Sequence, residues 1–426
     1  MSEFEIRTVD AREVLDCRLE PTLRVAVGTA GGFRGRADVP AGRSTGSHEA
    51  VERRDGGDRF RGKGVRTAVR TVEEEVGPAL AGTDVRDQRA VDDALRALDG
   101  TGRFAELGGN AATGVSLAAL KAAADGTGVH LYERVAQVAG RAGETLPIPL
   151  LDVVEGGELA ATALDFQEHQ LVPTGAGTFA EAIRMGAEVY YELGDRLAEA
   201  YGEASRNVGV EGGYTPPGMT DPREAFDAML GAVEECGYGD SFALAVDAAA
   251  THFYDAESGT YSLMGETRTP GEMIDVYADL ASAYPLESIE DPLDEADFGA
   301  TAELTGRVDA QIVGDDLFVT NADRVERGID ASAADALLFK INQVGTVTGA
   351  FDAAATAREG GYAVQVSERS GQTPDTWLAD VAVGLDAGQI KTGVTRGERT
   401  EQYNRLLRIE ERLGTAATYG DWPPTR

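Results

Sequence analysis

Apolar positions in the first third of the chain follow a strand pattern and then a helical pattern. Residues 4–30 contain FEIRTVDAREVL and PTLRVAVGTA on either side of the turn-rich DCRLE, which predicts a hairpin. A glycine-containing loop follows at 38–50, and apolar residues then recur at helical spacing through much of 64–137. The polar break AGRAGET precedes PIPLLDVV, so we expect one domain over residues 1–140 and a second over 141–426.

Short apolar strands alternate with helical stretches in the second part of the chain. The runs FALAVD, PLESIED, AQIVGDD, DALLFK, YAVQVSERS and GQIKTG recur at fairly regular intervals, and this alternation predicts a parallel sheet. A doubly wound sheet would give similar spacing. A (β/α) barrel is favoured because each run carries ionisable residues at its C-terminal end, which is the catalytic face of such a barrel.

The charge balance is strongly acidic. Asp and Glu total 73 against 39 Lys and Arg, a formal net charge of −34, which argues against a nucleic-acid partner because phosphate would be repelled. Because the start of the chain is charged, we expect no signal peptide, and because no long apolar run occurs, we expect no membrane span. Two cysteines make no disulfide framework, so we expect a cytoplasmic protein. The dispersed acid suits a high-salt environment, where screening removes self-repulsion.

Three successive strands of the predicted barrel end in a carboxylate. Asp247, Glu290 and Asp315 each follow an apolar run, and burying three carboxylates together requires a counter-charge. A hard cation with oxygen ligands supplies it, and Mg²⁺ is the usual choice. One such acid would more simply be a turn residue, but three in succession favour a metal site.

Basic residues occupy the next strand ends. Lys340 follows ALLF, and a lysine beside a dication in apolar surroundings is expected to have a lowered pKa and to act as a base. Lys391 in GQIKTG repeats this placement, and a rim lysine with its amine in water is the alternative for both. Arg369 and Ser370 offer a guanidinium and a hydroxyl for an anionic group, or only a rim salt bridge.

Two further acids are candidates for proton transfer. Glu168 follows ALDFQ, and Glu211 lies in the glycine-flanked loop NVGVEGGYTPP. Burial would raise the pKa of a carboxyl in such a tight loop and suit it to act as a general acid, and the alternative is a turn residue.

Ordered motifs along nearly the whole chain resemble the enolase family. They include DCRLEPT, LGGNAATGVSLA, FQEHQLVPTGA, NVGVEGG, SIEDPL, IVGDDLFVTN, LLFKINQVGT, VSERSGQT and NRLLRIEERLG. The resemblance implies an α/β fold, with an N-terminal α+β capping domain and an enolase-type barrel whose first strands are atypical in direction. It also implies a homodimer or higher oligomer, and a Mg²⁺-dependent lyase that dehydrates 2-phosphoglycerate to phosphoenolpyruvate.

The resemblance implies a role for each candidate in turn. Asp247, Glu290 and Asp315 would hold a first Mg²⁺, and Ser44 in the RSTG loop would help to hold a second. Lys340 would take the C2 proton of the substrate. Two Mg²⁺ ions would then stabilise the dianionic intermediate that this proton loss creates.

The other implied roles concern the leaving group and the substrate. Glu211 would assist departure of the C3 hydroxyl, with support from Glu168. The substrate-binding residues would be Gln167, Arg369, Ser370 and Lys391.

Several positions depart from the family pattern. The usual GGSHA loop reads GGELA, with Leu159 in place of histidine, and the usual SHRSGET reads SERSGQT, with Glu368 in place of a second histidine. Val210 replaces the Asp before Glu211, and the SGAST loop reads AGRST, with Arg43 at its centre. Leu159 and Glu368 are therefore expected to face the substrate and each to weaken phosphate binding by about a few kcal/mol, the scale of charge effects in a desolvated site.

These departures leave three functional readings. The first is a 2-phosphoglycerate dehydratase with a tolerant pocket. The second is a paralogue that runs the same α-proton chemistry on a different carboxylate. The third, a non-catalytic binding protein, is disfavoured because the metal-binding and proton-transfer residues are all present.

Overall fold

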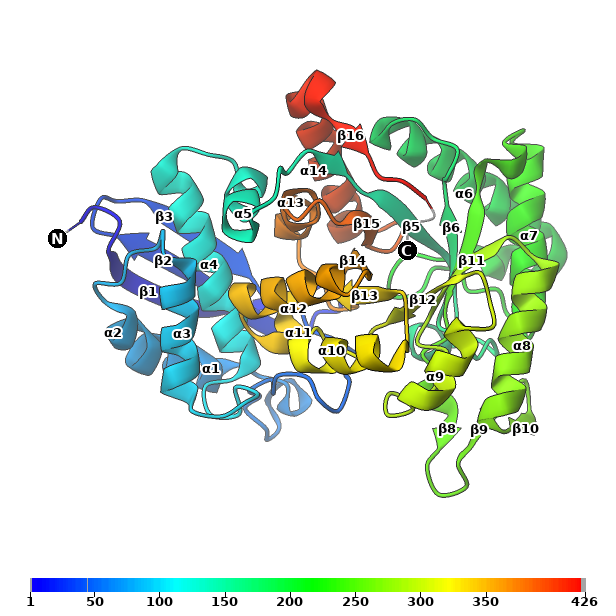
Figure 1. Cartoon of the computed structure of the whole chain (residues 1–426), viewed down its shortest axis with the longest axis horizontal. Helices are drawn as coiled ribbons and strands as arrows, with labels where there is room; N and C mark the ends of the chain where they lie inside the picture. Colours follow the sequence, from blue (N-terminus) through cyan, green and yellow to red (C-terminus); the bar gives the residue numbers. More distant parts are fainter. Residues whose placement is uncertain (1, 44, 423–426) are drawn as a thin grey trace.

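The computed structural model describes residues 2–43 and 45–422. Three antiparallel strands form the sheet of its N-terminal part (Figure 1). They are β1 Ile6–Leu15, β2 Pro21–Thr29 and β3 Arg34–Asp38. β1 pairs with β2 across a short turn, which confirms the predicted hairpin.

Helices pack on this sheet and on one another. They are α1 Arg66–Arg70, α2 Gly77–Leu80, α3 Gln88–Asp99, α4 Gly109–Thr127 and α5 Leu131–Ala139. Nearly all of α4 is buried, and its small residues bring its backbone close to β3. Gly35 shows how close, because a Cβ atom there would lie 1.9 Å from the carbonyl oxygen of Ala118. Only glycine fits at such an approach.

A closed eight-stranded barrel forms the second part, as predicted. In barrel order the strands are β11 Leu286–Glu290, β12 Gln311–Gly314, β13 Ala336–Phe339, β14 Ala363–Ser367, β15 Gly388–Lys391, β5 Ile148–Glu155, β6 Glu168–Val172 and β7 Ala243–Asp247. β6 runs antiparallel to both neighbours, while the other neighbouring strands pair in parallel. This matches the atypical direction of the first strands that the family resemblance implied.

The barrel strands are buried on both faces because helices surround them. Every residue of β5 is buried, including Asp152 and Glu155. The surrounding helices are α6 Phe179–Tyr201, α7 Pro222–Glu235, α8 Pro270–Ala283, α9 Phe298–Thr305, α10 Ala322–Ala331, α11 Ile341–Val344, α12 Val347–Glu359, α13 Trp377–Gly384 and α14 Gly397–Leu413. Helix starts are well specified: α8 begins with a capping box between Thr269 and Glu272 and with Pro270 in its first turn. None of the helices in the described ranges is long and apolar enough to cross a membrane.

Small sheets complete the fold. A hairpin-like sheet of β8 Tyr254–Asp255, β9 Thr260–Leu263 and β10 Glu266–Arg268 extends away from the barrel in Figure 1. The strands β4 Thr145–Leu146 and β16 Thr418–Tyr419 pair near the C-terminus.

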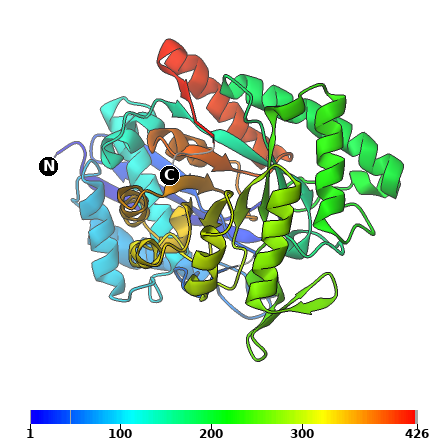
Figure 2. The same ribbon diagram turned by 45° about the vertical axis from the view of Figure 1, so that its right-hand side comes forward.

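The N-terminal part packs against one side of the barrel. Helix α3 contacts α12, α4 contacts α11, and α5 contacts α13, and Figures 1 and 2 show this side-by-side arrangement. The strands end slightly earlier than the apolar runs suggested: β14 ends at Ser367, so Glu368, Arg369 and Ser370 lie in the loop that follows it. This loop faces the N-terminal part.

Candidate active site

Most of the predicted site residues line one small cavity at the C-terminal ends of the barrel strands. The cavity measures about 30 Å³ and is lined by Leu159, Gln167, Glu168, Glu211, Asp247, Asp315, Lys340, Ser367, Glu368, Arg369, Ser370 and Lys391. Glu290 ends the neighbouring strand β11, and Ser44 lies outside the described residues. Such a volume is about that of one water molecule, so a substrate must displace contacts that these side chains now make with one another.

Lys391 lies at the centre of this acidic group. Its Nζ atom is 2.6 Å from Oε2 of Glu290, 2.9 Å from Oδ2 of Asp247 and 3.1 Å from Oε1 of Glu168. All four side chains are buried. Burial alone would lower the pKa of Lys391, but Asp247 and the two glutamates outweigh it and raise that pKa, so the ammonium stays charged.

Lys340, the predicted base, is paired with the third predicted metal ligand. Its Nζ atom lies 2.5 Å from Oδ2 of Asp315. The lowered pKa expected for this lysine presupposes a neighbouring dication, whereas its closest charged neighbour here is the Asp315 carboxylate. Burial does lower the pKa of Lys340, but the ion pair with Asp315 outweighs burial and the net shift is upward. The same contact lowers the pKa of Asp315 against the opposing effect of its burial.

The acidic side chains around Lys340 and Lys391 outnumber these two lysines, and this excess of negative charge indicates whether the site suits a metal cation. Oε1 of Glu290 is buried without a hydrogen-bond partner among the described residues. Burial and the charge of Asp247 raise the pKa of Glu290, and burial beside Asp315 raises the pKa of Asp291 to about 8. Surplus buried carboxylate with an unpaired oxygen is the environment that a divalent cation neutralises. The donor set therefore fits a hard cation.

The structure also groups carboxylates that the sequence analysis did not group. Two sets of three have ligand oxygens within 4.8 Å of one another: Asp152, Glu168 and Glu211, and separately Asp291, Asp315 and Asp316. Of the predicted metal ligands, only Asp315 belongs to either set. Asp247 and Glu290 meet instead through Lys391.

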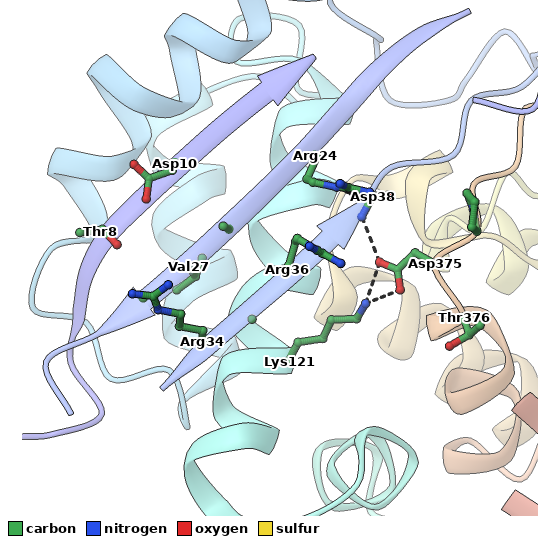
Figure 3. A pocket seen from close by; sticks show the side chains of 14 residues that line it. Thr8, Asp10, Arg24, Val27, Arg34, Arg36, Asp38, Lys121, Asp375 and Thr376 are labelled. Atoms are coloured by element: carbon green, nitrogen blue, oxygen red, sulfur yellow. Dashed lines mark hydrogen bonds and ion pairs between the residues drawn. The ribbon is translucent and has the colours of Figure 1, made fainter. Parts of the chain in front are cut away.

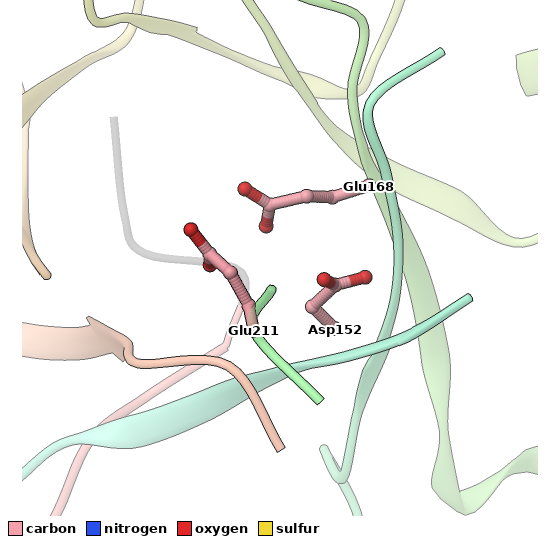
Figure 4. A group of neighbouring side chains, drawn as sticks. All are labelled: Asp152, Glu168 and Glu211. Atoms are coloured by element: carbon pink, nitrogen blue, oxygen red, sulfur yellow. The ribbon is translucent and has the colours of Figure 1, made fainter. Parts of the chain in front are cut away.

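Glu168 and Glu211 meet in the first of these sets, and Figure 4 shows their carboxyl groups converging with that of Asp152. Burial raises the pKa of Glu168 to about 8, although Lys391 opposes the shift and Glu211 adds to it. Both oxygens of Asp152 are buried without a partner among the described residues, and burial together with Glu168 raises its pKa well above the usual value. Burial therefore favours the protonated forms of Asp152 and Glu168, so proton-carrying groups lie beside Glu211.

Glu155 positions the loop that carries Glu211, and sequence reasoning missed it. Oε1 of Glu155 accepts the backbone N–H of Glu211 at 3.0 Å and that of Gly213 at 2.7 Å. Gly209 makes room for this carboxylate, since a Cβ atom there would lie 2.1 Å from Oε2 of Glu155. Glu155 ends an apolar strand, so the rule that selected Asp247 and Glu290 would also have selected it.

The N-terminal part contributes directly to the site. Glu49 accepts two hydrogen bonds from the guanidinium of Arg369, at 2.9 and 3.0 Å, and both side chains are buried. The backbone N–H of Arg43 donates to Oγ of Ser370 at 2.8 Å. Burial lowers the pKa of Arg369, but Glu49 outweighs it and raises that pKa. The predicted anion-binding residues are therefore held by the capping loop at 38–50.

The two positions that lack the family histidines both reach the cavity. Leu159 ends a short 3₁₀ turn, Gly157–Leu159, and is buried. Glu368 is also buried, and its carboxylate forms an ion pair with the buried guanidinium of Arg399. Gln167 lines the same cavity, where its Nε2 donates to Asp247 at 3.1 Å and its Oε1 is buried without a partner among the described residues.

A larger cavity of about 820 Å³ lies elsewhere, on the N-terminal sheet (Figure 3). Lys121 donates to both oxygens of Asp375 there, at 2.5 and 2.7 Å, and Arg24 pairs with Asp38. None of the predicted site residues lines this cavity, and these charges already neutralise one another. The chemistry is therefore assigned to the smaller cavity in the barrel.

Comparison with known proteins gives a consistent family. Residues 6–135 match the enolase N-terminal domain, and residues 143–422 match the enolase C-terminal TIM barrel domain. The chain is 52% identical to the enolase of Methanopyrus kandleri over 420 residues, 97% of each chain. It is 48% identical to that of Thermococcus gammatolerans over 423 residues, 98% of this chain and 97% of the relative. With the enolase barrel, its capping domain and about half of all positions shared over nearly the full length, the chain belongs to the enolase family.

Proposed function

We propose that this protein dehydrates 2-phosphoglycerate to phosphoenolpyruvate in a Mg²⁺-dependent reaction. The observation that carries the proposal is the single cavity in which Lys340, Glu211 and Glu168 meet the carboxylates of Asp247 and Asp315. A base, an acid and an electrostatic site within one buried space are what proton abstraction next to a carboxylate requires.

Asp247, Glu290 and Asp315 are the proposed ligands of the first Mg²⁺, and Ser44 is proposed to help hold a second. The unpaired oxygen of Glu290 and the surplus of buried acid support this assignment. When bound, the metal would supply positive charge that stabilises the additional negative charge formed as the substrate loses its C2 proton. Lys391 bridges Asp247 and Glu290, and Lys340 pairs with Asp315, so the two lysines offset only part of this negative charge.

Lys340 is the proposed base for the C2 proton, and Glu211 the proposed acid for the C3 hydroxyl. The raised pKa of Glu168, to about 8 through burial and the nearby Glu211, keeps a proton available beside Glu211 at neutral pH. The backbone N–H bonds to Glu155 fix the loop that presents Glu211. Proton removal and hydroxide departure are thereby assigned to different side chains.

An anionic substrate would meet several cationic and polar groups. Arg369 and Ser370 are proposed to bind the phosphate and Lys391 the carboxylate, while Gln167 offers an unpaired carbonyl oxygen to a hydroxyl group. Because Lys391 already bridges acidic side chains, substrate binding must exchange these contacts for new ones. Arg369 keeps Glu49 as its partner in the capping loop.

The second reading is a paralogue that acts on another carboxylate substrate. It was based on Leu159 and Glu368, which stand where the family pattern has histidines. Full-length relatives named enolase at about half identity support the first reading instead. Glu368 is also neutralised by Arg399, so its charge is not simply added to the phosphate site.

We propose a cytoplasmic homodimer as the working form, assembled partly through the N-terminal domain over residues 1–140, with the barrel domain over 141–426. This follows the family resemblance. Light scattering at high salt tests it, and a monomeric mass would contradict it.

The proposed function is tested by following the C2 proton. The protein is incubated with 2-phosphoglycerate and Mg²⁺ in D₂O at high KCl, and the C2–H signal is followed by NMR. We expect the signal to disappear only with protein and Mg²⁺ present. A persistent C2–H signal with folded protein would contradict the assignment.

A further inference from the structure

Glu368 occupies an unusual place for an acidic residue at an anion-binding site. It is the first residue after β14, its side chain is 1% exposed, and it lines the same cavity as Glu211. An isolated carboxylate at this depth would be strongly destabilising. The contacts of Glu368 therefore show which groups compensate its buried charge and which residues it can position.

Arg399 on α14 supplies the compensating charge. Its side chain is fully buried, and its Nη1 atom donates to Oε2 of Glu368. The same guanidinium donates to the carbonyl oxygens of Arg369 at 3.1 Å and Ser370 at 3.0 Å. One planar group thus fixes both the side chain of Glu368 and the backbone of the anion-binding loop, which a lysine could not do with its single amine.

The second oxygen of Glu368 has no partner among the described residues, in the cavity that Glu211 also lines. Thr392 donates to Oε2 at 3.3 Å, whereas Oε1 of Glu368 and Oε2 of Glu211 are both buried without a partner among the described hydrogen bonds. Burial raises the pKa of Glu368, Arg399 opposes this, and the adjacent Glu211 carboxyl raises it further. An unpartnered carboxyl oxygen from each residue therefore lies buried in one cavity, where a protonated Glu368 could donate to Glu211.

A second departure from the family pattern lies on the other side of the same guanidinium. Nη2 of Arg399 is 3.5 Å from the carbonyl oxygen of Val210. Position 210 has lost the family's aspartate while position 368 has gained a glutamate.

We propose that Glu368 is a positioning residue for Glu211, with Arg399 as the counter-ion that makes a carboxyl group possible at position 368. The inference rests on the proposed function. Glu155 holds the backbone of Glu211, and Glu368 holds its side chain toward the cavity in the place of the missing imidazole. Glu368 then acts through Glu211 and does not itself contact the reacting atoms.

Two variants separate this role from a purely structural one. Glu368→Gln keeps the shape and an amide N–H that can donate to Glu211, but it loses the ion pair with Arg399. Glu368→Ala loses both. Glu398→Gln is the matched control, because Glu398 lies 3.8 Å from Nε of Arg399 and outside the cavity lining. For each variant we would measure the thermal unfolding midpoint, the dehydration rate, and the rate of C2-proton exchange.

We expect Glu368→Ala to lower the ratio of the dehydration rate to the C2-proton exchange rate by about 10- to 100-fold, the scale of a misplaced catalytic group. Glu368→Gln should keep this ratio near the wild-type value, while its unfolding midpoint falls. Glu398→Gln should change the ratio little. The inference is overturned if Glu368→Ala keeps the wild-type ratio of dehydration to exchange. It is also overturned if this ratio falls as far in Glu368→Gln as in Glu368→Ala. Absence of both activities in the folded wild type would instead refute the proposed function. The unfolding midpoint of Glu368→Gln would then still test the Arg399 pairing, and an unchanged midpoint would contradict it.

Discussion

The Nζ atom of Lys340 lies 2.5 Å from Oδ2 of Asp315, so the proposed base and a proposed metal ligand are in direct contact. The charge of Asp315 explains why the pKa of Lys340 is raised even though burial acts to lower it. It also means that the positive charge of the base and the negative charge of the ligand stabilise each other. Removing either side chain leaves the other as an unpaired buried charge.

Lys340→Ala should abolish C2-proton exchange, by about 10²- to 10⁴-fold, because the base for this step is lost. Mg²⁺ binding, measured by titration calorimetry, should be retained because the lysine is not a ligand. Lys121→Ala is a suitable control, since Lys121 pairs with Asp375 in the separate cavity of the N-terminal sheet. Exchange at close to the wild-type rate in Lys340→Ala would rule out this lysine as the base.

Glu211→Gln should slow dehydration more than proton exchange, because an amide cannot protonate the departing hydroxyl group. The two rates are compared in the same sample by NMR and by product absorbance. Equal losses in both rates would argue against separate groups for the two steps.

Asp386 should stabilise the link between the two domains. Its two oxygens accept backbone N–H bonds from residues 142–145, at 2.9 to 3.1 Å. Burial raises the pKa of Asp386, but the N–H bonds outweigh burial and lower it. Asp386→Asn, which removes one acceptor oxygen, should cost about 1–3 kcal/mol of unfolding free energy at neutral pH.

The sign of the pH dependence follows from the lowered pKa of Asp386. The stabilisation is present above the unfolded-state pKa of about 3.9 and is lost as pH falls through the lower folded-state value. The difference in unfolding free energy between the wild type and Asp386→Asn should therefore shrink in acid. A difference that stays constant down to low pH would contradict the charged hydrogen-bond acceptor.

Lower salt should destabilise the whole protein. With a formal net charge of −34, self-repulsion grows as screening is removed. Thermal unfolding in a KCl series should show a midpoint that rises with salt. A higher midpoint in dilute buffer would refute the high-salt interpretation of the acidic composition.

The sequence was sufficient for the barrel because its strand ends carry the chemistry. Asp247, Glu290 and Lys340 could be placed at the C-terminal edge from apolar runs and their final residues alone. The partners of these residues could not, because they depend on which side chains meet across the barrel. No sequence pattern singled out Arg399 as a residue of the site. It lies in a polar helical stretch that resembles an exposed surface, yet it is fully buried.

Electrostatic state was the other property that the sequence could not predict. An apolar run before Lys340 suggested a lowered pKa, but the shift depends on Asp315, which lies 25 residues away in sequence. Likewise, the sequence suggested that Glu368 would repel a phosphate group, because it did not reveal that Arg399 forms an ion pair with Glu368. In both cases a close ion pair outweighs or offsets the cost of burial.

The most direct test of the account is product formation from 2-phosphoglycerate. The wild type and Lys340→Ala are each mixed with 2-phosphoglycerate and Mg²⁺ at high KCl, and the absorbance of phosphoenolpyruvate is followed, with a chelator added in a parallel sample. The account predicts a steady rise with the wild type that is lost with Lys340→Ala and with the chelator. No rise with folded, Mg²⁺-loaded wild type, or an equal rise with Lys340→Ala, would contradict it.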